Sequence, residues 1–262
     1  MSKSLGNSPE PLDLIAKFGA DGVRVGMLLC SPAGNDLLYD DSLPEQGRNF
    51  ANKIWNAFRL VKSWTVGADE AQPASSALAV KWMREAIGQG IAQIDSDFRR
   101  FRISEALMTV YKLFWDDFSG WYLEIVKPEY GKPVDRASYD ASISFFDTLL
   151  RLIHPFMPFI SEEIWQLLDE RKDGESIMVS RMPEPGKFSR ELISGFETVK
   201  ETVTAIRSLR KERNIPSGEK IMLFARPAGT FAGEEFFPVI IRLCNLADLA
   251  KVDSRQEDAV SF

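Results

Sequence analysis

The sequence predicts a mainly α protein, an antiparallel helix bundle followed by a small α/β subdomain. Apolar residues recur at spacings of three and four through residues 50–168, which is the period of amphipathic helices. The connections between these helices are short, as in a bundle of antiparallel neighbours. After Gly174, short apolar runs typical of strands alternate with a helix. We therefore predict an N-terminal segment at 1–42, a bundle at 43–174 and an α/β subdomain at 175–262.

Two short helices are expected in the N-terminal segment. Ser8 is suited to cap the first helix and Pro9 to occupy its first turn. This helix runs to about Phe18, where Gly19 is placed to end it in a left-handed cap. The second helix spans about residues 21–30 and stops at a run of Ser, Pro, Ala and Gly.

Long amphipathic helices follow from about residue 44. A small polar connection at 65–76 separates the first from the second, and Lys127-Pro128 ends the third. Ser161 is placed to cap a last short helix that runs through Leu168. The long helices are predicted from the stripe Phe50, Ile54, Ala57, Phe58 and Val61, the stripe Val80, Met83, Ile87, Ile91, Ile94 and Phe98, and the spans 104–126 and 137–153.

The last part of the chain mixes strands with a helix. Short apolar runs predict strands at 177–179, 221–224 and 260–262. Between the first two, a helix is predicted from the apolar stripe Leu192, Phe196, Val199, Val203, Ile206 and Leu209.

Composition excludes several classes of protein. The chain has 32 Lys and Arg against 38 Asp and Glu, a net charge of −6, which argues against a protein that coats DNA non-specifically. Two cysteines and one histidine cannot form a Cys/His zinc cluster or a disulfide framework, so we expect no metal site and a reducing cytoplasm. No apolar run is long enough for a membrane span, and residues 1–7 lack the apolar core of a signal peptide.

The strongest short motif is the opening Met1-Ser-Lys-Ser4, followed by Leu5-Gly-Asn7. A lysine on a small, flexible loop can fold over a polyphosphate and neutralise the charge that develops as pyrophosphate leaves. The motif resembles the second signature of class I aminoacyl-tRNA synthetases, Lys-Met-Ser-Lys-Ser, without its leading lysine. The blocks Pro11-Leu-Asp-Leu-Ile15 and Phe18-Gly-Ala-Asp-Gly-Val-Arg24 are similar to the helix pair that follows this loop in the valine, isoleucine, leucine and methionine enzymes.

Three further blocks narrow the resemblance to the valyl-tRNA synthetases. The first resembles that family's entry into its anticodon-binding bundle, and the others resemble its Trp-Asp-Glu-Phe-Cys-Asp-Trp-Tyr-Ile-Glu and His-Pro-Phe-Met-Pro-Phe-Ile-Thr-Glu-Glu-Leu-Trp blocks. Ser119-Gly120 stands where the family has Cys-Asp. The blocks are Gly34-Asn-Asp36 through Tyr39-Asp40 followed by Gly47-Arg-Asn-Phe-Ala-Asn-Lys-Ile-Trp-Asn56, then Trp115-Asp-Asp-Phe-Ser-Gly-Trp-Tyr-Leu-Glu124 and His154-Pro-Phe-Met-Pro-Phe-Ile-Ser-Glu-Glu-Ile-Trp165.

The resemblance implies a C-terminal fragment of a synthetase that joins valine to its tRNA with ATP and Mg²⁺. In the full-length enzyme, Lys3 steadies the phosphates of ATP, and Met1, Ser2 and Ser4 shape the same loop. Nothing in the chain resembles the nucleotide-binding sheet, its His-x-Gly-His signature or the editing domain, so the fragment alone is expected to bind no cofactor and to be inactive. Valine tRNA is the expected partner of a cytoplasmic monomer that binds neither DNA nor membranes.

Two basic or amide-rich surfaces are candidates for binding tRNA. Amides read base edges, and Lys and Arg hold phosphates. Arg99, Arg100 and Arg102 form a third, weaker candidate, and ordinary solvated surface is the alternative for all of them. The leading candidates are Arg48, Asn49, Asn52, Lys53, Asn56 and Arg59 on the first long helix, with Lys53 first, and Arg207, Arg210, Lys211 and Arg213 on the last.

Two rival interpretations stay open at the level of sequence. The first is the corresponding domain of an isoleucyl-tRNA synthetase. The Gly47 and Trp115 blocks favour the valine enzyme over it. The second is a helical protein-interaction module without an RNA role, which predicts indifference to tRNA. Phosphate contacts would instead give binding that weakens steeply with salt.

Overall fold

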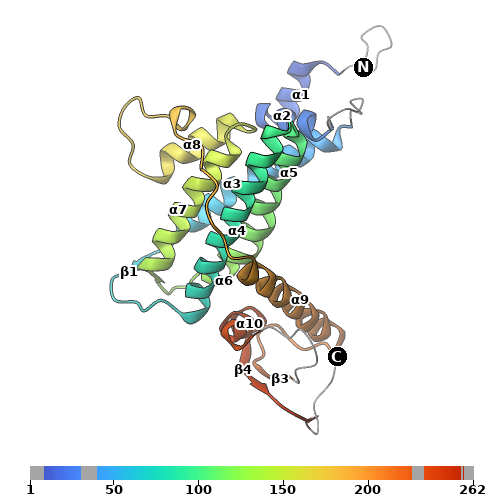
Figure 1. Cartoon of the computed structure of the whole chain (residues 1–262), viewed down its shortest axis with the longest axis vertical. Coiled ribbons are helices and arrows are strands. Elements are labelled where there is room, and N and C mark those ends of the chain that lie inside the picture. Colours follow the sequence, from blue (N-terminus) through green and yellow to red (C-terminus); the bar gives the residue numbers. More distant parts are fainter. Residues whose placement is uncertain (1–8, 31–39, 226–232, 255, 257–262) are drawn as a thin grey trace.

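The computed structural model describes residues 9–30, 40–225, 233–254 and 256. Long helices lie side by side along the long axis of the molecule, and a smaller unit packs at one end (Figure 1). The elements are α1 Pro11–Phe18, α2 Ala20–Leu29, α3 Ser42–Lys62, β1 Val66–Gly67, α4 Ala74–Arg99, α5 Ile103–Lys112, the π-helix η2 Leu113–Tyr122, α6 Leu123–Val126, β2 Val134–Asp135, α7 Arg136–Ile153, α8 Pro158–Leu168, the 3₁₀-helix η3 Ile177–Val179, α9 Arg190–Glu212, β3 Ile221–Ala225, the 3₁₀-helix η4 Glu234–Phe236, α10 Phe237–Cys244 and β4 Leu246–Lys251.

The helix pair predicted near the N-terminus is present. Its first helix begins at Pro11, so Pro11 rather than Pro9 occupies the first turn, and Ser8 lies outside the described residues. Gly19 ends α1 with a φ of +76°, a conformation that glycine adopts without strain. A second glycine, Gly47, lets α3 approach α2, because a Cβ atom there would lie 2.5 Å from the carbonyl oxygen of Gly22.

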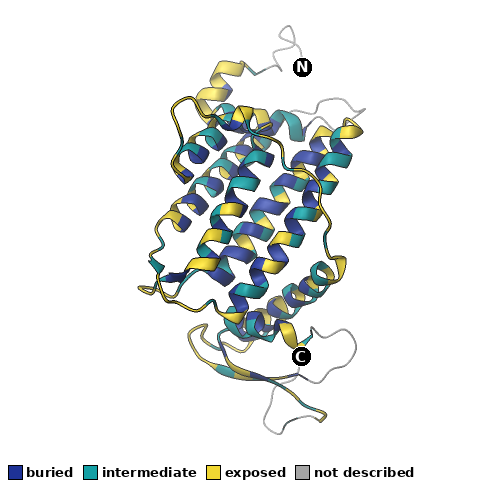
Figure 2. Ribbon diagram, turned by 60° about the vertical axis from the view of Figure 1, so that its left-hand side comes forward, coloured by how far each residue is buried: buried dark blue, intermediate teal, exposed yellow. Residues whose placement is uncertain are grey.

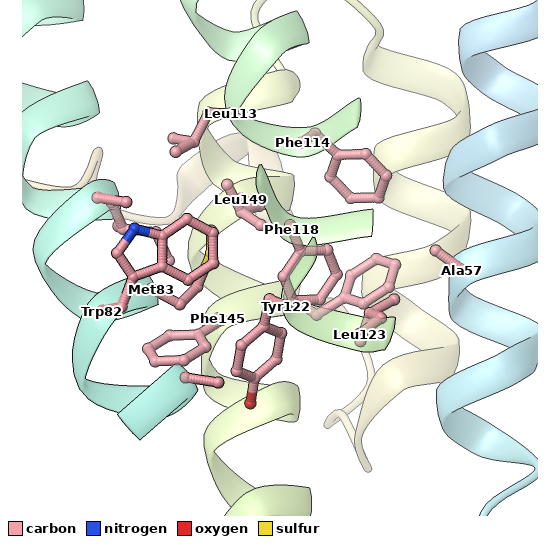
Figure 3. Packing of buried hydrophobic residues seen from close by; sticks show 14 of the residues in the cluster. Ala57, Trp82, Met83, Leu113, Phe114, Phe118, Tyr122, Leu123, Phe145 and Leu149 are labelled. Atoms are coloured by element: carbon pink, nitrogen blue, oxygen red, sulfur yellow. The ribbon is translucent and has the colours of Figure 1, made fainter. Parts of the chain in front are cut away.

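The apolar stripes of the bundle helices face one another. Figure 2 shows them as buried bands, with exposed residues on the outer sides. Aromatic rings fill the centre: Phe118 stacks on Tyr122 with ring centroids 5.5 Å apart and meets Phe146 edge to face at 5.4 Å. The close-up in Figure 3 shows Phe118 and Tyr122 projecting into this core. The Tyr122 hydroxyl is buried and lies 2.9 Å from Ser142 Oγ, so its polar end is satisfied.

The single helix predicted at 104–126 is continuous, but its middle is not α-helical. It consists of α5, the π-helix η2 and α6 in direct succession. In a π-helix each N–H donates to the carbonyl five residues back, and stretches of this kind concentrate at functional sites. The wider turn changes which side chains share a face, and it decides the geometry of the groove described below.

The predicted cap of α8 is wrong. The helix begins at Pro158, three residues before Ser161, and the Ser161 hydroxyl donates back to the carbonyl of Met157 at 2.6 Å. Asp21 of α2 supplies the missing acceptor: its carboxylate receives the N–H of Phe159 at 3.3 Å and of Ile160 at 2.8 Å. A carboxylate from another helix therefore caps α8.

Arg24 completes this joint between α2 and α8. Its guanidinium donates to the carbonyls of Phe156 at 3.1 Å and Pro155 at 3.2 Å. His154 lies at the same place, with Nδ1 2.8 Å from Ser161 Oγ. The chain's single histidine thus has a structural partner.

The joint makes stability depend on pH. Burial lowers the pKa of His154, although Glu162 and Asp21 act to raise it and Arg24 lowers it further. As the pH falls through the ordinary histidine pKa of about 6.5, His154 becomes protonated in the unfolded chain but stays neutral in the folded protein. The free energy of unfolding is therefore expected to fall between pH 7.5 and 5.5. Urea unfolding at both pH values measures it.

His154→Gln serves as the control for this prediction. Glutamine removes the titrating ring and keeps a polar group near Ser161, so the extra loss of stability on acidification should disappear. The chain has no other histidine, and groups that titrate elsewhere cancel in the comparison. An identical pH dependence in the wild type and the variant would contradict the prediction.

The C-terminal unit is an α/β unit, as predicted, but its strands differ from the prediction. β3 confirms the strand at 221–224 and pairs in parallel with β4, with α10 as the connection between them. The strand predicted at 177–179 is wrong: this segment is the 3₁₀-helix η3, in which the Ser176 side chain accepts from the N–H of Met178. The strand predicted at 260–262 lies outside the described residues. A second short parallel pair joins β1 to β2.

The C-terminal unit packs directly on the bundle. Phe196 of α9 stacks on Trp82 of α4 with ring centroids 3.8 Å apart and planes 9° from parallel. Both side chains are buried, and α10 also contacts α4. The bundle and the C-terminal unit therefore share one apolar core. The three predicted segments, 1–42, 43–174 and 175–262, stay predictions. No described helix is long and apolar enough to cross a membrane.

Candidate nucleic-acid interface

A groove of about 620 Å³ lies between α3, α4, η2 and α9. Lys53 of α3 stands at one side, Gln89 and Gln93 of α4 line another, and Trp115 and Trp121 come from η2. Part of the lining comes from the core itself, through residues such as Trp82 and Leu113, which are labelled in Figure 3. The groove is thus built on packed helices rather than on loops.

The π-helix determines which side chains reach the groove. Lys112 and Trp121 are nine residues apart, about two and a half α-helical turns, so an α-helix would place them on opposite sides. The wider turn of η2 instead brings both to the groove, together with Asp116 and Asp117. A cation, two carboxylates and an indole therefore share one wall.

The two tryptophans are half-buried, and a cationic side chain lies near each indole ring. Trp115 stacks on Tyr111 with centroids 5.4 Å apart and planes 10° from parallel. The Nζ atom of Lys53 lies 5.3 Å from the Trp115 ring centroid, and the guanidinium of Arg207 lies 6.0 Å from that of Trp121. Aromatic rings flanked by cations are suited to stacking an unpaired base while its phosphates are neutralised.

An ion pair fixes the carboxylate side of the groove. Lys200 Nζ of α9 lies 2.7 Å from Asp117 Oδ1 and 2.8 Å from Glu197 Oε1. Burial raises the pKa of Asp117, and Lys200 offsets part of this shift. Burial acts to lower the pKa of Lys200, but Asp117 and Glu197 outweigh it and the pKa is raised. The pair ties α9 to η2 at the edge of the groove.

The residues predicted on the first long helix divide into two groups. Asn49, Asn52, Asn56 and Arg59 are exposed on α3, while the side chain of Lys53 reaches the groove. Arg48 is turned toward α1 instead.

Arg48 is held by contacts at the junction of α1 and α3. Its guanidinium contacts Glu45 at 3.1 Å and the carbonyl of Lys17 at 3.5 Å, and it lies 5.7 Å from the Phe18 ring centroid. These partners give Arg48 a structural role, whereas Lys53 lines the groove and the three asparagines are exposed on the same helix.

The structure separates one residue of the second predicted patch from the other three. Arg207, Lys211 and Arg213 are exposed, but Arg210 is 6 % exposed and is not on the same accessible face. Its guanidinium donates to the carbonyls of Cys244 at 3.0 Å, of Pro216 at 2.8 Å and of Glu219. Arg210 thus binds the chain's own backbone and is unavailable to a ligand.

Several groove residues were not singled out by the sequence analysis. Trp115, Trp121, Asp116 and Asp117 entered it only as members of a block that resembles the valyl-tRNA synthetases, and the glutamines of α4 carried no motif. Met1, Ser2, Lys3 and Ser4 lie outside the described residues. Among the described residues, no group of three or more His, Cys, Asp or Glu side chains is placed to hold a metal ion.

Residues 80–225 match the family described as the anticodon-binding domain of tRNA ligase, and this match covers more than half of the chain. The chain belongs to this family. The matched segment begins in α4 and ends in β3, and it contains most of the groove.

Proteins similar to this chain include valine–tRNA ligases from three bacteria. The ligase of Parabacteroides distasonis is 55 % identical and that of Phocaeicola vulgatus 52 % identical, both over the whole chain. The ligase of Fusobacterium nucleatum is 33 % identical over 95 % of the chain. The chain spans 30 % of the length of each of these relatives. The predicted resemblance to valyl-tRNA synthetases is confirmed.

The solved structures that share the fold of this chain include the agnB2 LeuRS of Agrobacterium radiobacter K84, in a ternary complex with tRNA and LeuAMS. The two sequences are 22 % identical, with a TM-score of 0.50 over 74 % of this chain and 22 % of that one. The mainly α fold class predicted from the sequence is confirmed.

Proposed function

We propose that this chain is the tRNA-recognition part of a valine–tRNA ligase and that its groove receives unpaired anticodon bases. The observation that carries the proposal is the groove itself, in which Trp115 lies beside Lys53 and which Trp121 and two carboxylates also line. The family match and the valine–tRNA ligases among its relatives support the choice of tRNA and of valine over isoleucine.

The chemistry of the groove suits single-stranded RNA. Unpaired bases stack on indole rings, and the exocyclic amino groups of cytosine and adenine donate to carboxylates such as Asp116 and Asp117. The exposed amides of Asn49, Asn52 and Asn56 extend the recognition surface beside the groove, because amides bond bidentately to adenine. Arg59, Arg207, Lys211 and Arg213 remain candidates for phosphate contacts.

The complete ligase would join valine to its tRNA with ATP and Mg²⁺ as a cytoplasmic monomer, without binding DNA. This part of the proposal rests on the resemblance, since the residues assigned to ATP, Met1–Ser4, lie outside the described residues. We expect the chain alone to show no exchange between ATP and pyrophosphate. Such exchange by a clean preparation of the chain would contradict the proposal that it recognises tRNA and does not activate valine.

Replacing Trp115 with alanine should weaken the binding of valine tRNA by about 5- to 150-fold, because one stacked base contributes about 1–3 kcal/mol. It should also reduce the preference over tRNA with a substituted anticodon. Trp115→Phe keeps an aromatic face and should retain most of the affinity, and Lys53→Ala should weaken binding as well. Fluorescence titrations with both RNAs measure these effects.

The control for this titration is Trp55→Ala. Trp55 is also half-buried in the bundle, where it contacts Phe58 with centroids 5.6 Å apart, but it does not line the groove. Its removal should leave the anticodon preference unchanged. Equal binding of the two RNAs by the wild type, or unchanged binding by Trp115→Ala, would refute the proposal. Binding that ignores salt would favour a protein-interaction module.

A further inference from the structure

The connection between α4 and α5 displays an aromatic ring on a fixed backbone. Phe101 has a φ of +58°, a left-handed conformation that is unusual for a bulky residue, and its side chain is 84 % exposed. The surrounding backbone is held by hydrogen bonds from the N–H of Arg100 and of Arg102 to the carbonyl of Asp97, at 3.1 and 2.9 Å. Strain of this kind persists only where the structure imposes it, and it concentrates at binding sites.

Two arginines, Arg100 and Arg102, flank Phe101 in the sequence. Arg99 pairs with Asp95 at 2.8 Å, but neither Arg100 nor Arg102 has an ion-pair partner within the part of the chain that the structure describes. Of the nearby carboxylates, Asp97 is buried and accepts from Gln93, and Glu105 is exposed on the first turn of α5. We call Arg100, Phe101 and Arg102 the tip.

The tip continues the lining of the groove. Arg100 comes seven residues after Gln93, and Arg102 comes seven residues before Thr109, and both Gln93 and Thr109 line the groove. Arg100 directly follows the last residue of α4 and Arg102 directly precedes the first residue of α5, so each lies about two helical turns, or roughly 10 Å along the axis, from its partner in the lining. The ends of α4 and α5 nearest the groove residues Gln93 and Thr109 therefore carry the two arginines.

We propose that the tip is a second RNA contact, which holds the phosphate backbone of the anticodon stem while the groove holds the loop. The inference rests on the function proposed above. The forked guanidinium groups of Arg100 and Arg102 fit phosphate oxygens, and Phe101 packs against a ribose or a base beside them. A stem that leaves the groove along α4 and α5 meets these cations about two helical turns away.

The test is a titration of valine tRNA at several salt concentrations with Arg100→Gln/Arg102→Gln. We expect at least a tenfold loss of affinity and a slope of log K against log salt that is smaller by about two, roughly one for each phosphate contact. The preference over anticodon-substituted tRNA should stay as in the wild type, because phosphate contacts position the RNA without reading its bases.

A matched double variant and a conformational variant isolate the effect. Arg136→Gln/Arg181→Gln makes the same charge change on exposed arginines away from the tip and should bind as the wild type does. Phe101→Gly removes the ring at a φ that glycine adopts freely, so the fold should hold while the affinity falls several-fold.

The outcomes separate this inference from the function on which it rests. If the wild type prefers the native anticodon but the tip variants keep wild-type affinity and salt slope, the tip contact is overturned and the groove stands. Equal losses in both arginine double variants would also overturn it, since they would report net charge alone. If the wild type shows no anticodon preference, the groove proposal fails, and a selective loss in the tip variants still supports the RNA contact.

Discussion

Replacing Phe196 with alanine is expected to lower the free energy of unfolding by about 3–5 kcal/mol, the usual cost of removing a large buried ring. Phe196 is fully buried, stacks on Trp82 at 3.8 Å and meets Phe236 edge to face at 6.4 Å. It thus joins α9 to the bundle and to η4. Urea unfolding followed by circular dichroism measures the loss.

The same substitution should weaken tRNA binding, because Ile193, Glu197 and Lys200 on α9 form one side of the groove. Phe159→Ala is the matched control: this phenylalanine is 64 % exposed, and its loss should change stability by less than about 0.5 kcal/mol. Similar losses of stability in the two variants would show that the Trp82–Phe196 contact does not hold the C-terminal unit in place.

Replacing Arg210 with methionine should cost about 2–3 kcal/mol of unfolding free energy. Methionine keeps much of the side-chain length but withdraws the donors from the carbonyls of Cys244, Pro216 and Glu219, and an unpaired buried polar group costs about 1–3 kcal/mol. Pro216 and Glu219 lie in an exposed turn, where water replaces part of the lost bonding. Thermal and urea unfolding measure the change.

Arg207→Met is the control for Arg210. Arg207 is exposed on the same helix and donates to one carbonyl, that of Leu243, so its loss should change stability little. Arg207→Met should instead weaken RNA binding, because the guanidinium lies beside Trp121. Equal destabilisation by the two variants, or a larger effect of Arg210→Met on RNA affinity than on stability, would contradict the structural role assigned to Arg210.

The bundle could be predicted from the sequence because its helices follow a single rule. In α3, α4 and α7 the apolar residues repeat with the α-helical period and all face one core, so local pattern and tertiary burial agree. Lys53 could be placed on one helix face with Asn49 and Asn56, because positions three and four residues apart are neighbours on a helix.

The groove could not be predicted because a rule of α-helical spacing fails in η2. That rule places Lys112 and Trp121 on opposite sides of the helix, whereas the π-helix places both at the groove. No local pattern in residues 113–122 predicts the wider turn. Arg210 was misplaced for a related reason. Its three acceptors lie 6–34 residues further along the chain, so its burial depends on tertiary contacts.

β4 illustrates the same limit in secondary structure. Its sequence, Leu-Ala-Asp-Leu-Ala-Lys, is rich in residues that favour helices, and its extended conformation comes from pairing with β3. Val179 shows the converse, because this strand-forming residue pairs with no strand of the described chain and remains exposed in a 3₁₀ turn. Pairing partners, rather than propensity, decided both segments.

The joint between α2 and α8 has a consequence for biosynthesis. Asp21 and Arg24 bind backbone groups 131–139 residues further along the chain. A nascent polypeptide therefore cannot complete the cap of α8 until residue 160 has left the ribosome, although α2 emerges well before it. Closing so long a loop is entropically costly and slows folding. Until α8 has been synthesised, the Asp21 carboxylate and the Arg24 guanidinium of α2 have to stay hydrated.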